Sequence, residues 1–299
     1  MNRPPQCFVC LVENRLKDLL KLGSSSDSLL LMLDALSRLS ALERTEAFVE
    51  SFEEVKKLTG VSDPYGPTKT RLMRAVAEVA PLLLEAAKGD GIRGLLGLAA
   101  SANALDTRVL GYEFNEGSNL SDLLATPPLI NDADEALLRR ARTLAYVLDN
   151  HGEAVVDALV AAELSRLGLE VKVVARGSPY EIDVTYAEAL ELLGENIEVL
   201  STGTPYPALY RRRAPRQVVE VLEGVDLVIA KGIANLEAYM DEPGWLRGKA
   251  LFALRAKCPP IAKMFGVPRG SPLVASEHRV MELLERGPLS LVAISPGET

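Results

Sequence analysis

The fold is decided by residues 144–153, LAYVLDNHGE, where a short apolar run gives way to polar residues and a glycine. A run of this kind, ended by turn-forming residues, is typical of a buried strand. Similar apolar runs occur at 170–175, 197–200, 225–230, 251–254 and 289–294, and amphipathic segments lie among them at 153–167, 186–193, 216–222 and 277–284. Strands that alternate with helices predict right-handed crossovers, and hence a doubly wound, mainly parallel, Rossmann-like α/β sheet.

The sequence before this stretch has a different pattern. Apolar residues recur three and four positions apart, as at Met73, Val76 and Val79, and strong strand signals are absent. This spacing predicts amphipathic helices. We therefore expect an all-helical domain over 1–142, a candidate contributor to a substrate pocket, and an α/β domain over 143–299.

The composition narrows the class of protein. Of the 299 residues, 48% are hydrophobic and 25% are charged, which is the balance of a folded globular protein. The formal charge of −8 argues against a nucleic-acid binder, which normally carries a basic face. There is no apolar run long enough for a membrane helix and no signal-peptide pattern. We expect a cytoplasmic protein that binds neither nucleic acid nor membrane.

Polar or glycine-containing turns follow five strands in succession. In an open parallel sheet, ligands bind beyond the carboxyl ends of the strands. The residues that follow the strands are Asp149 and Asn150, then Arg176 and Asp183, then Thr202 and Gly203, then Lys231, Gly232 and Asn235, and finally Arg255 and Lys257. We expect these groups to converge on one edge of the sheet.

The side chains in these turns suit a particular chemistry. Asp149, Asn150 and Asp183 offer the oxygen ligands that Mg²⁺ and Mn²⁺ prefer. A divalent ion between a phosphate group and a water molecule polarises phosphorus and lowers the pKa of the water. Glu153 either orients that water or simply begins a helix.

Phosphate would be bound by the remaining turns. Lys231 and Lys257 can neutralise its charge, and backbone N–H groups at Thr202, Gly203 and Gly232 can hold its oxygens. Each feature alone has an ordinary explanation, since Asp-Asn before glycine is common in turns and a lysine at a strand end is usually solvated. Only the shared location of these residues indicates a site.

Six blocks of sequence, in the same order, resemble the damage-control phosphatase family, catalogued as domain of unknown function 89 proteins, and particularly its compact archaeal branch. The resemblance covers nearly the whole chain. The blocks are Cys7-Phe-Val-Cys10, Ser101-Ala-Asn103-Ala-Leu-Asp106, Asp149-Asn-His-Gly-Glu153, Asp183-Val-Thr185, Lys231-Gly-Ile-Ala-Asn235-Leu-Glu237 and Leu254-Arg-Ala-Lys257-Cys258-Pro.

The resemblance implies a helical part packed on an α/β domain, and it implies roles for individual residues. A divalent metal ion would be held by Asp149, Asn150 and Asp183, and phosphate would be contacted by Lys231, the turn through Asn235, and Lys257. Two positions depart from the family pattern. Ile182 stands where many members have Asn, and Pro207 stands near the place of a glycine.

These observations predict an enzyme that hydrolyses phosphate monoesters of small metabolites, either sugar phosphates or damaged phospho-metabolites. The cofactor would be Mn²⁺, Mg²⁺, Co²⁺ or Ni²⁺. Asp149, Asn150, Asp183 and Lys231 would carry the reaction by metal-activated water, with an aspartyl-phosphate on Asp149 as a variant. Asn103 and Asp106, from the helical part, are candidates for substrate selection.

Alternative functions are a methyltransferase that uses S-adenosylmethionine and a non-catalytic sensor of phosphorylated metabolites. The usual glycine-rich loop of a methyltransferase does not follow the first predicted strand. Cys7 and Cys10 lack the further ligands of a closed zinc site, so we expect reduced thiols. The arginines at 211–213 are interpreted as a solvated face, or less simply as a lid over an anionic substrate.

Overall fold

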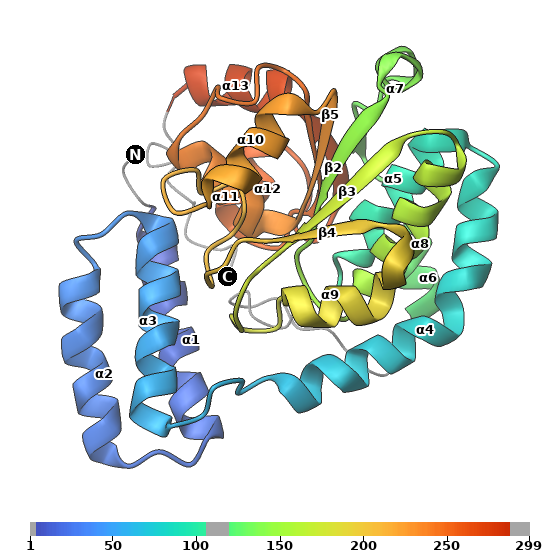
Figure 1. The fold of residues 1–299 in the computed structure, drawn as a ribbon. Coiled ribbons are helices and arrows are strands. Elements are labelled where there is room, and N and C mark those ends of the chain that lie inside the picture. Colours follow the sequence, from blue (N-terminus) through green and yellow to red (C-terminus); the bar gives the residue numbers. More distant parts are fainter. Residues whose placement is uncertain (1–3, 106–119, 288–299) are drawn as a thin grey trace.

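A sheet forms the centre of the protein (Figure 1). It has seven strands in the order β1-β7-β6-β5-β2-β3-β4. The computed structural model describes residues 4–105 and 120–287. The strands are β1 (Ile130–Asn131), β2 (Thr143–Val147), β3 (Glu170–Ala175), β4 (Glu198–Ser201), β5 (Leu227–Lys231), β6 (Ala250–Arg255) and β7 (Pro272–Ser276). Strands β2 to β6 are parallel, whereas β7 is antiparallel to β6 and carries β1 parallel to itself.

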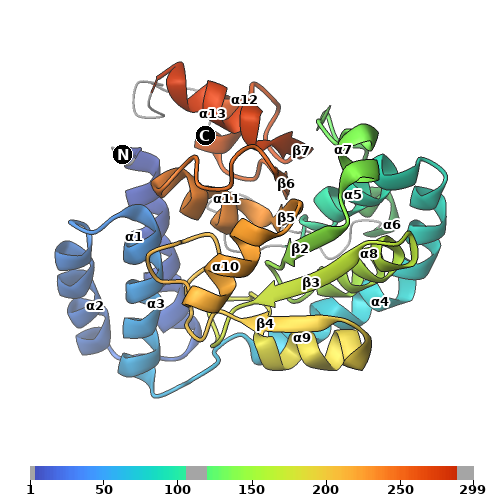
Figure 2. The same cartoon turned by 45° about the horizontal axis from the view of Figure 1, so that its top comes forward.

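Helices cover both faces of this sheet and extend beyond it (Figure 2). They are α1 (Pro5–Lys21), α2 (Ser26–Leu39), α3 (Arg44–Thr59), α4 (Gly66–Lys88), α5 (Gly91–Ala102), α6 (Leu120–Leu124), α7 (Glu135–Arg140), α8 (Ala154–Arg166), α9 (Tyr186–Leu193), α10 (Arg216–Gly224), α11 (Gly232–Asp241), α12 (Pro259–Phe265) and α13 (Glu277–Glu285), with a 3₁₀ turn at Gly194–Asn196. None of the helices that the structure describes has the length and apolar run that a bilayer crossing requires.

The two faces of the sheet have separate cores. Along β2, Leu144 and Tyr146 belong to the core that α4, α5 and α8 cover, while Ala145 and Val147 belong to the core of the opposite face. Successive side chains of a strand point to opposite faces, so a strand that is buried on both sides is apolar throughout. This explains why the central strands read as continuous apolar runs.

The chain reverses its direction of winding between β2 and β5. From β2 it runs to β3 and β4 on one side, then crosses back to place β5 beside β2 and β6 beyond it. The loops that leave β2 and β5 therefore separate at the carboxyl edge. A crevice at such a switch point is where open α/β sheets bind ligands.

The N-terminal helices divide into two groups. Helices α1, α2 and α3 pack on one another and reach the α/β part through α11, whereas α4 and α5 lie against α8 and the strands β6 and β7 (Figures 1 and 2). The region over 1–142 was predicted to be all-helical, and this is wrong at β1. That strand exists because the backbone of Leu129 and Asp132 bonds to β7, with no β-rich run of its own.

The predicted α/β class with a mainly parallel sheet is confirmed. The apolar runs at 144–148, 170–175, 197–200, 225–230 and 251–254 correspond to β2 through β6. The run at 289–294 lies outside the described residues. The seventh strand, β7, was not predicted, because its five residues begin with proline and show little alternation.

Candidate active site

The Asp149-Asn150 turn lies directly after β2 and is paired with the segment that contains Asp183. The amide of His151 donates to the carbonyl of Ile182 (2.8 Å), and the amide of Val184 donates to the carbonyl of Asp149 (2.8 Å). Asn150 and Asp183 thus face each other as a β-bridge pair. Asp149, Asn150 and Asp183 are all buried, with 3–5% of their surface exposed. Backbone pairing therefore brings the three predicted oxygen ligands together.

Asp183 is oriented by Arg176, the first residue after β3. The Nε of Arg176 donates to Asp183 Oδ2, and its Nη1 donates to the carbonyl of Pro205. The guanidinium also lies over the ring of Tyr180, 4.4 Å from its centroid. Arg176 was noted in the sequence as a strand-end residue but was not predicted to belong to the site.

The carboxylate of Asp149 lies at the N-terminus of α11. Gly232, the first residue of this helix, has φ +73°, and a Cβ built on it would fall 1.8 Å from Asp149 Oδ2. A side chain at this position is excluded both by the backbone conformation and by the carboxylate. The N-terminus of a helix stabilises a negative charge, so the position suits a carboxylate.

Asn103, at the end of α5, connects the N-terminal part of the chain to this carboxylate. Its Nδ2 donates to Asp149 Oδ2 (3.0 Å) and to Glu153 Oε1 (2.9 Å), while its Oδ1 accepts from the backbone amide of Arg255 (3.2 Å). Asn103 is completely buried. Asn103 therefore joins the loop after β2 to the end of β6. Asp106, its predicted companion, lies outside the described residues.

Lys231 points into the protein toward two carboxylates on the α8 side of the sheet. Its Nζ donates to Glu153 Oε1 (3.0 Å) and to Asp157 Oδ1 and Oδ2 (2.8 and 3.0 Å). Tyr146 also donates its hydroxyl to Asp157 Oδ1 (2.7 Å). An ammonium group has three donors, and these contacts occupy it. In this structure Lys231 therefore binds carboxylates, and its predicted contact with phosphate stays a prediction.

The charged groups of this buried cluster shift one another's pKa values. Burial opposes the charge of Lys231, but the negative charges of Asp157 and Glu153 outweigh it and raise the pKa of Lys231. Burial raises the pKa of Asp157 to about 6, an effect that the charge of Lys231 partly offsets. Lys231 therefore stays protonated and holds Glu153 beside Asn103.

Asn235 joins the loops at the switch point. Its Nδ2 donates to the carbonyls of Leu148 (3.1 Å) and Lys231 (2.9 Å), which end β2 and β5. Its Oδ1 is buried and accepts no hydrogen bond from any residue that the structure describes. Buried acceptors are normally satisfied, so this oxygen marks a place where a ligand or water is expected.

The turn at Thr202 and Gly203 holds two loops together. Thr202 Oγ1 accepts from the amide of Gly177 (3.0 Å) and donates to the carbonyl of Thr204 (2.8 Å). The amides of Thr202 and Gly203 are engaged with Ala175 and with Ser201 Oγ. Since these donors already have partners, the turn is not arranged as the predicted phosphate cradle.

Lys257 follows β6 at the same edge of the sheet and is completely buried. Its carbonyl accepts from Arg269 Nε (2.5 Å). The nearby Arg255 fixes this loop, because its guanidinium donates to the backbone carbonyls of Ser101, Leu123 and Gly270. The structure therefore carries the second predicted lysine on a firmly held loop.

The donor set at this edge fits a hard divalent cation. No group of three or more Cys, His, Asp and Glu side chains among residues 4–105 and 120–287 is placed to hold a metal ion, so a cation here would rely on fewer acidic ligands. Asn150 donates its Nδ2 to Asp149 Oδ2 (2.8 Å), which makes its Oδ1 the atom it can offer. Two carboxylates and one amide oxygen would leave several positions for water and substrate.

Other features singled out in the sequence are structural. Arg211, Arg212 and Arg213 form ion pairs with Glu223 (2.7 Å), Glu43 (2.9 Å) and Glu46 (3.3 Å), as a solvated face should. Cys7, Cys10 and Cys258 are all thiols. Burial, followed by the charge of Glu237, raises the pKa of Cys258, so this thiol stays protonated.

Besides Arg176, Asp157 and Arg255 have roles near this edge that the sequence did not reveal. Asp157 interrupts an otherwise apolar helix face, four residues after Glu153, and an acidic residue on the sheet-facing side of a helix is a usable signal. The role of Arg255 has no comparable local signal, because its partners come from residues 101, 123 and 270.

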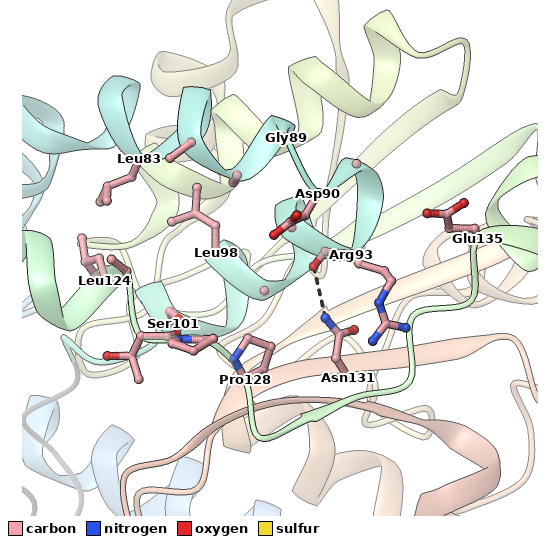
Figure 3. Close-up of a pocket in the computed structure, with 18 residues that line it drawn as sticks. Leu83, Gly89, Asp90, Arg93, Leu98, Ser101, Leu124, Pro128, Asn131 and Glu135 are labelled. Carbon is pink, nitrogen blue, oxygen red and sulfur yellow. Dashed lines mark hydrogen bonds between the residues drawn. The ribbon is translucent and has the colours of Figure 1, made fainter.

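A separate pocket of about 740 Å³ lies beside α5 (Figure 3). Leu98, Ser101 and Leu124 line it, and Asn131 closes one side by donating to the carbonyl of Arg93 (3.1 Å). None of the predicted site residues that the structure describes lines this pocket. The pocket lies beside α5, which Asn103 follows, but Asp149 does not line it.

The fold and this edge define a class, namely α/β proteins with buried acidic residues and lysines at the carboxyl ends of the strands of a mainly parallel sheet. The chain belongs to the damage-control phosphatase family, since the family model described as the damage-control phosphatase ARMT1-like domain matches residues 4–273. This confirms the resemblance seen in the six sequence blocks and assigns the chain to a family of phosphatases.

Individual relatives support this family assignment. The chain is 31% identical to a damage-control phosphatase of Archaeoglobus fulgidus over 71% of its own length and 75% of that protein. It is 25% identical to a damage-control phosphatase of Pyrococcus horikoshii over 74% of its length and 77% of that protein. A crystal structure of a domain-of-unknown-function-89 protein from Pyrococcus horikoshii superposes with a TM-score of 0.77 at 23% identity, and covers 93% of this chain and 99% of that one.

Proposed function

We propose that this protein is a divalent-metal-dependent phosphatase that hydrolyses phosphate monoesters of small metabolites. The observation that carries the proposal is the backbone pairing of residues 149–151 with 182–184, which places the buried residues Asp149, Asn150 and Asp183 on adjoining segments. The names of the relatives support the phosphatase activity. Family membership also favours a phosphatase over the methyltransferase alternative.

Asp149, Asn150 and Asp183 would hold the metal ion, for which Mn²⁺, Mg²⁺, Co²⁺ and Ni²⁺ are the candidates. When bound, the ion supplies positive charge for the phosphate oxygens and a water of lowered pKa. Around these ligands, Arg176 orients Asp183 and Asn103 orients Asp149. Partners that orient metal ligands are needed nearly as much as the ligands themselves.

We assign different roles to the two lysines. Lys231 holds Glu153 and Asp157, and we propose that it fixes the Glu153 carboxylate next to Asn103. Lys257 is the side chain that we propose for phosphate contact, because it stands in a block that resembles the family, and backbone N–H groups at the start of α11 would aid it. Asn235 Oδ1 would accept a hydrogen bond from a bound water or a substrate hydroxyl group.

The proposed substrate class rests on the burial of the proposed ligands and on the net charge of the chain. The metal ligands are 95% or more buried, which suits a small phosphorylated metabolite. The net charge of −8 disfavours a long polyanion such as nucleic acid. Sugar phosphates and damaged phospho-metabolites are therefore the compounds to test first.

The experiment is phosphate release from a panel of phosphorylated metabolites by chelated protein, with Mn²⁺, Mg²⁺, Co²⁺ and Ni²⁺ added back singly. We expect activity only after metal addition, and none in folded Asp149→Ala protein. Solvent ¹⁸O entering inorganic phosphate, together with a failed search for a phosphoenzyme, would support water attack. Full activity of Asp149→Ala would overturn the assignment.

A further inference from the structure

Arg15, on α1, is a buried cation that connects the first helix to the loop before Asp183. It is completely buried, and its guanidinium donates to Ser51 Oγ (2.9 Å), Asp18 Oδ2 (2.5 Å) and the carboxylate of Glu181. Burial opposes its charge, but Glu181, Tyr180 and Asp18 outweigh this and raise the pKa of Arg15. An arginine bound in this way stays charged and has one well-defined geometry.

Glu181 has an unusual backbone conformation. Its φ is +43°, in the left-handed region that residues other than glycine rarely adopt. Such a conformation persists only when the surroundings hold it. The observed restraint on its side chain is Arg15, which lies 166 positions earlier in the chain. The contact therefore holds the backbone two residues before Asp183.

Helices α1 and α3 contact the same loop at three successive residues. Lys56 Nζ donates to the carbonyl of Pro179 (3.1 Å), and Phe52 packs edge-on against Tyr180, with ring centroids 5.3 Å apart. Arg15 itself lies over the ring of Phe52 (5.1 Å). Residues 179, 180 and 181 are thus fixed in succession by the N-terminal helices.

The held loop leads directly into the site. The amide of Asp183 donates to the carbonyl of Tyr180 (2.9 Å), and residues 182–184 then pair with residues 149–151. Any change in the Glu181 backbone must move either this turn or the paired segment. The contact between Arg15 and Glu181 therefore influences the position of Asp183 through the backbone.

We propose that Arg15 is a positioning residue for Asp183, acting through the left-handed backbone of Glu181, so that helices α1 to α3 complete a metal site whose ligands all lie elsewhere. The inference rests on the proposed function, because it assumes that Asp183 binds a metal ion. The positioning itself is argued from the described contacts. It gives the N-terminal helices a part in the reaction without any contact to substrate.

The test compares three folded variants. Arg15→Met removes the cation, and Glu181→Gln keeps the shape of the side chain but removes its charge. Arg44→Met is the matched control, because Arg44 is also a buried arginine, on α3, but pairs with Glu237 (3.5 Å) and Asp241 (3.6 Å) on α11. Two quantities are measured, namely hydrogen exchange of the amides of His151, Asp183 and Val184 in metal-free protein, and the Mn²⁺ dissociation constant.

We expect Arg15→Met to accelerate exchange at these amides by roughly tenfold and to weaken Mn²⁺ binding by about tenfold. Glu181→Gln should cause the same changes to a smaller extent, and it serves as the test if Arg15→Met does not fold. Wild-type exchange rates in folded Arg15→Met or Glu181→Gln, or equal acceleration in Arg44→Met, would overturn the proposal. If the wild type binds no Mn²⁺, the proposed function fails, while exchange still reports whether Arg15 holds the loop.

Discussion

The Asp149 carboxylate lies where a side chain on Gly232 would have to be. A Cβ on Gly232 would come within 1.8 Å of Asp149 Oδ2. We therefore expect Gly232→Ala to displace Asp149 and to abolish metal binding and turnover. The left-handed backbone adds a cost of about 1–2 kcal/mol in stability.

The control for this variant is Gly60→Ala. Gly60 has a similar φ of +70°, and no described atom lies within 4 Å of its Cβ position. It should lose about 1–2 kcal/mol in stability and keep full activity. Denaturant unfolding and phosphate release distinguish the two effects. An active Gly232→Ala enzyme would show that Asp149 need not occupy its observed position.

Lys231→Met should destabilise the protein severely, because it leaves Glu153 and Asp157 as buried carboxylates without their cation. Breaking a buried ion pair from one side costs about 3–5 kcal/mol. Adding Asp157→Asn should restore part of the loss, which a double-mutant cycle in urea would measure.

For comparison, Lys172 on β3 is only partly buried and pairs with Glu198 at 2.9 Å. Lys172→Met should change stability by about 0.5 kcal/mol or less. If Lys231→Met were as stable as Lys172→Met but inactive, Lys231 would be a phosphate contact, as the sequence predicted, rather than the holder of Glu153.

Asn103→Asp should impair the site while keeping the size of the side chain. It replaces the amide donor by a third carboxylate beside Asp149 and Glu153, which now accept from Asn103 Nδ2. Losing a partner of a metal ligand typically lowers affinity or activity by about 10–100-fold. Steady-state kinetics and Mn²⁺ titration would measure this.

Asn131→Asp makes the same chemical change on β1, where the amide donates to the carbonyl of Arg93. We expect it to leave turnover at the wild-type level. Equal kinetics for Asn103→Asp and the wild type would show that Asn103 is not needed to orient Asp149.

The ion pair between Asp132 and Arg279 should make stability depend on pH. Burial tends to raise the pKa of Asp132, but hydrogen bonds from Arg279 (2.6 and 2.7 Å) and from Ser276 outweigh it and hold the pKa below its ordinary value. The folded state therefore binds this proton less tightly than the unfolded state. The stabilisation is present above the unfolded pKa of about 3.9 and is lost as pH falls through the folded value.

Asp132→Asn tests this sign. Since Asp132 is partly exposed and screened by solvent, we expect a loss of about 1 kcal/mol at pH 7. The difference from the wild type should shrink as the pH falls below about 4. Urea unfolding of both proteins at pH 7, 5 and 3 gives the comparison. A difference that is constant over this range would mean that the carboxylate charge is not involved.

Much of the fold was predictable because it depends on local pattern. Strands β2, β5 and β6 are buried on both faces, so each shows an apolar run that can be read from sequence, and β3 and β4 keep shorter apolar runs. Strand β1 has two residues and forms only because β7 offers it an edge, so no local signal exists for it. The sequence thus reveals elements with their own apolar pattern and misses those that depend on a distant partner.

In the candidate site, too, features with a local pattern were predictable and features that depend on distant residues were not. The positions of Asp149 and Lys231 after strands were predictable, but the direction of the Lys231 side chain depends on which face of β5 it occupies and on the acids that α8 places there. The contact between Asn103 and Asp149 joins residues 46 positions apart. Such a contact is fixed only when α5 has packed against the sheet.

Titration of chelated protein with Mn²⁺ tests the central claim most directly, with Asp183→Asn as the comparison. Calorimetry of the wild type should show a single equivalent bound per chain, and folded Asp183→Asn should bind at least about tenfold more weakly. Unchanged stoichiometry and affinity in Asp183→Asn would contradict the account, because the pairing of Asp183 with Asn150 would then have no role in holding a metal ion.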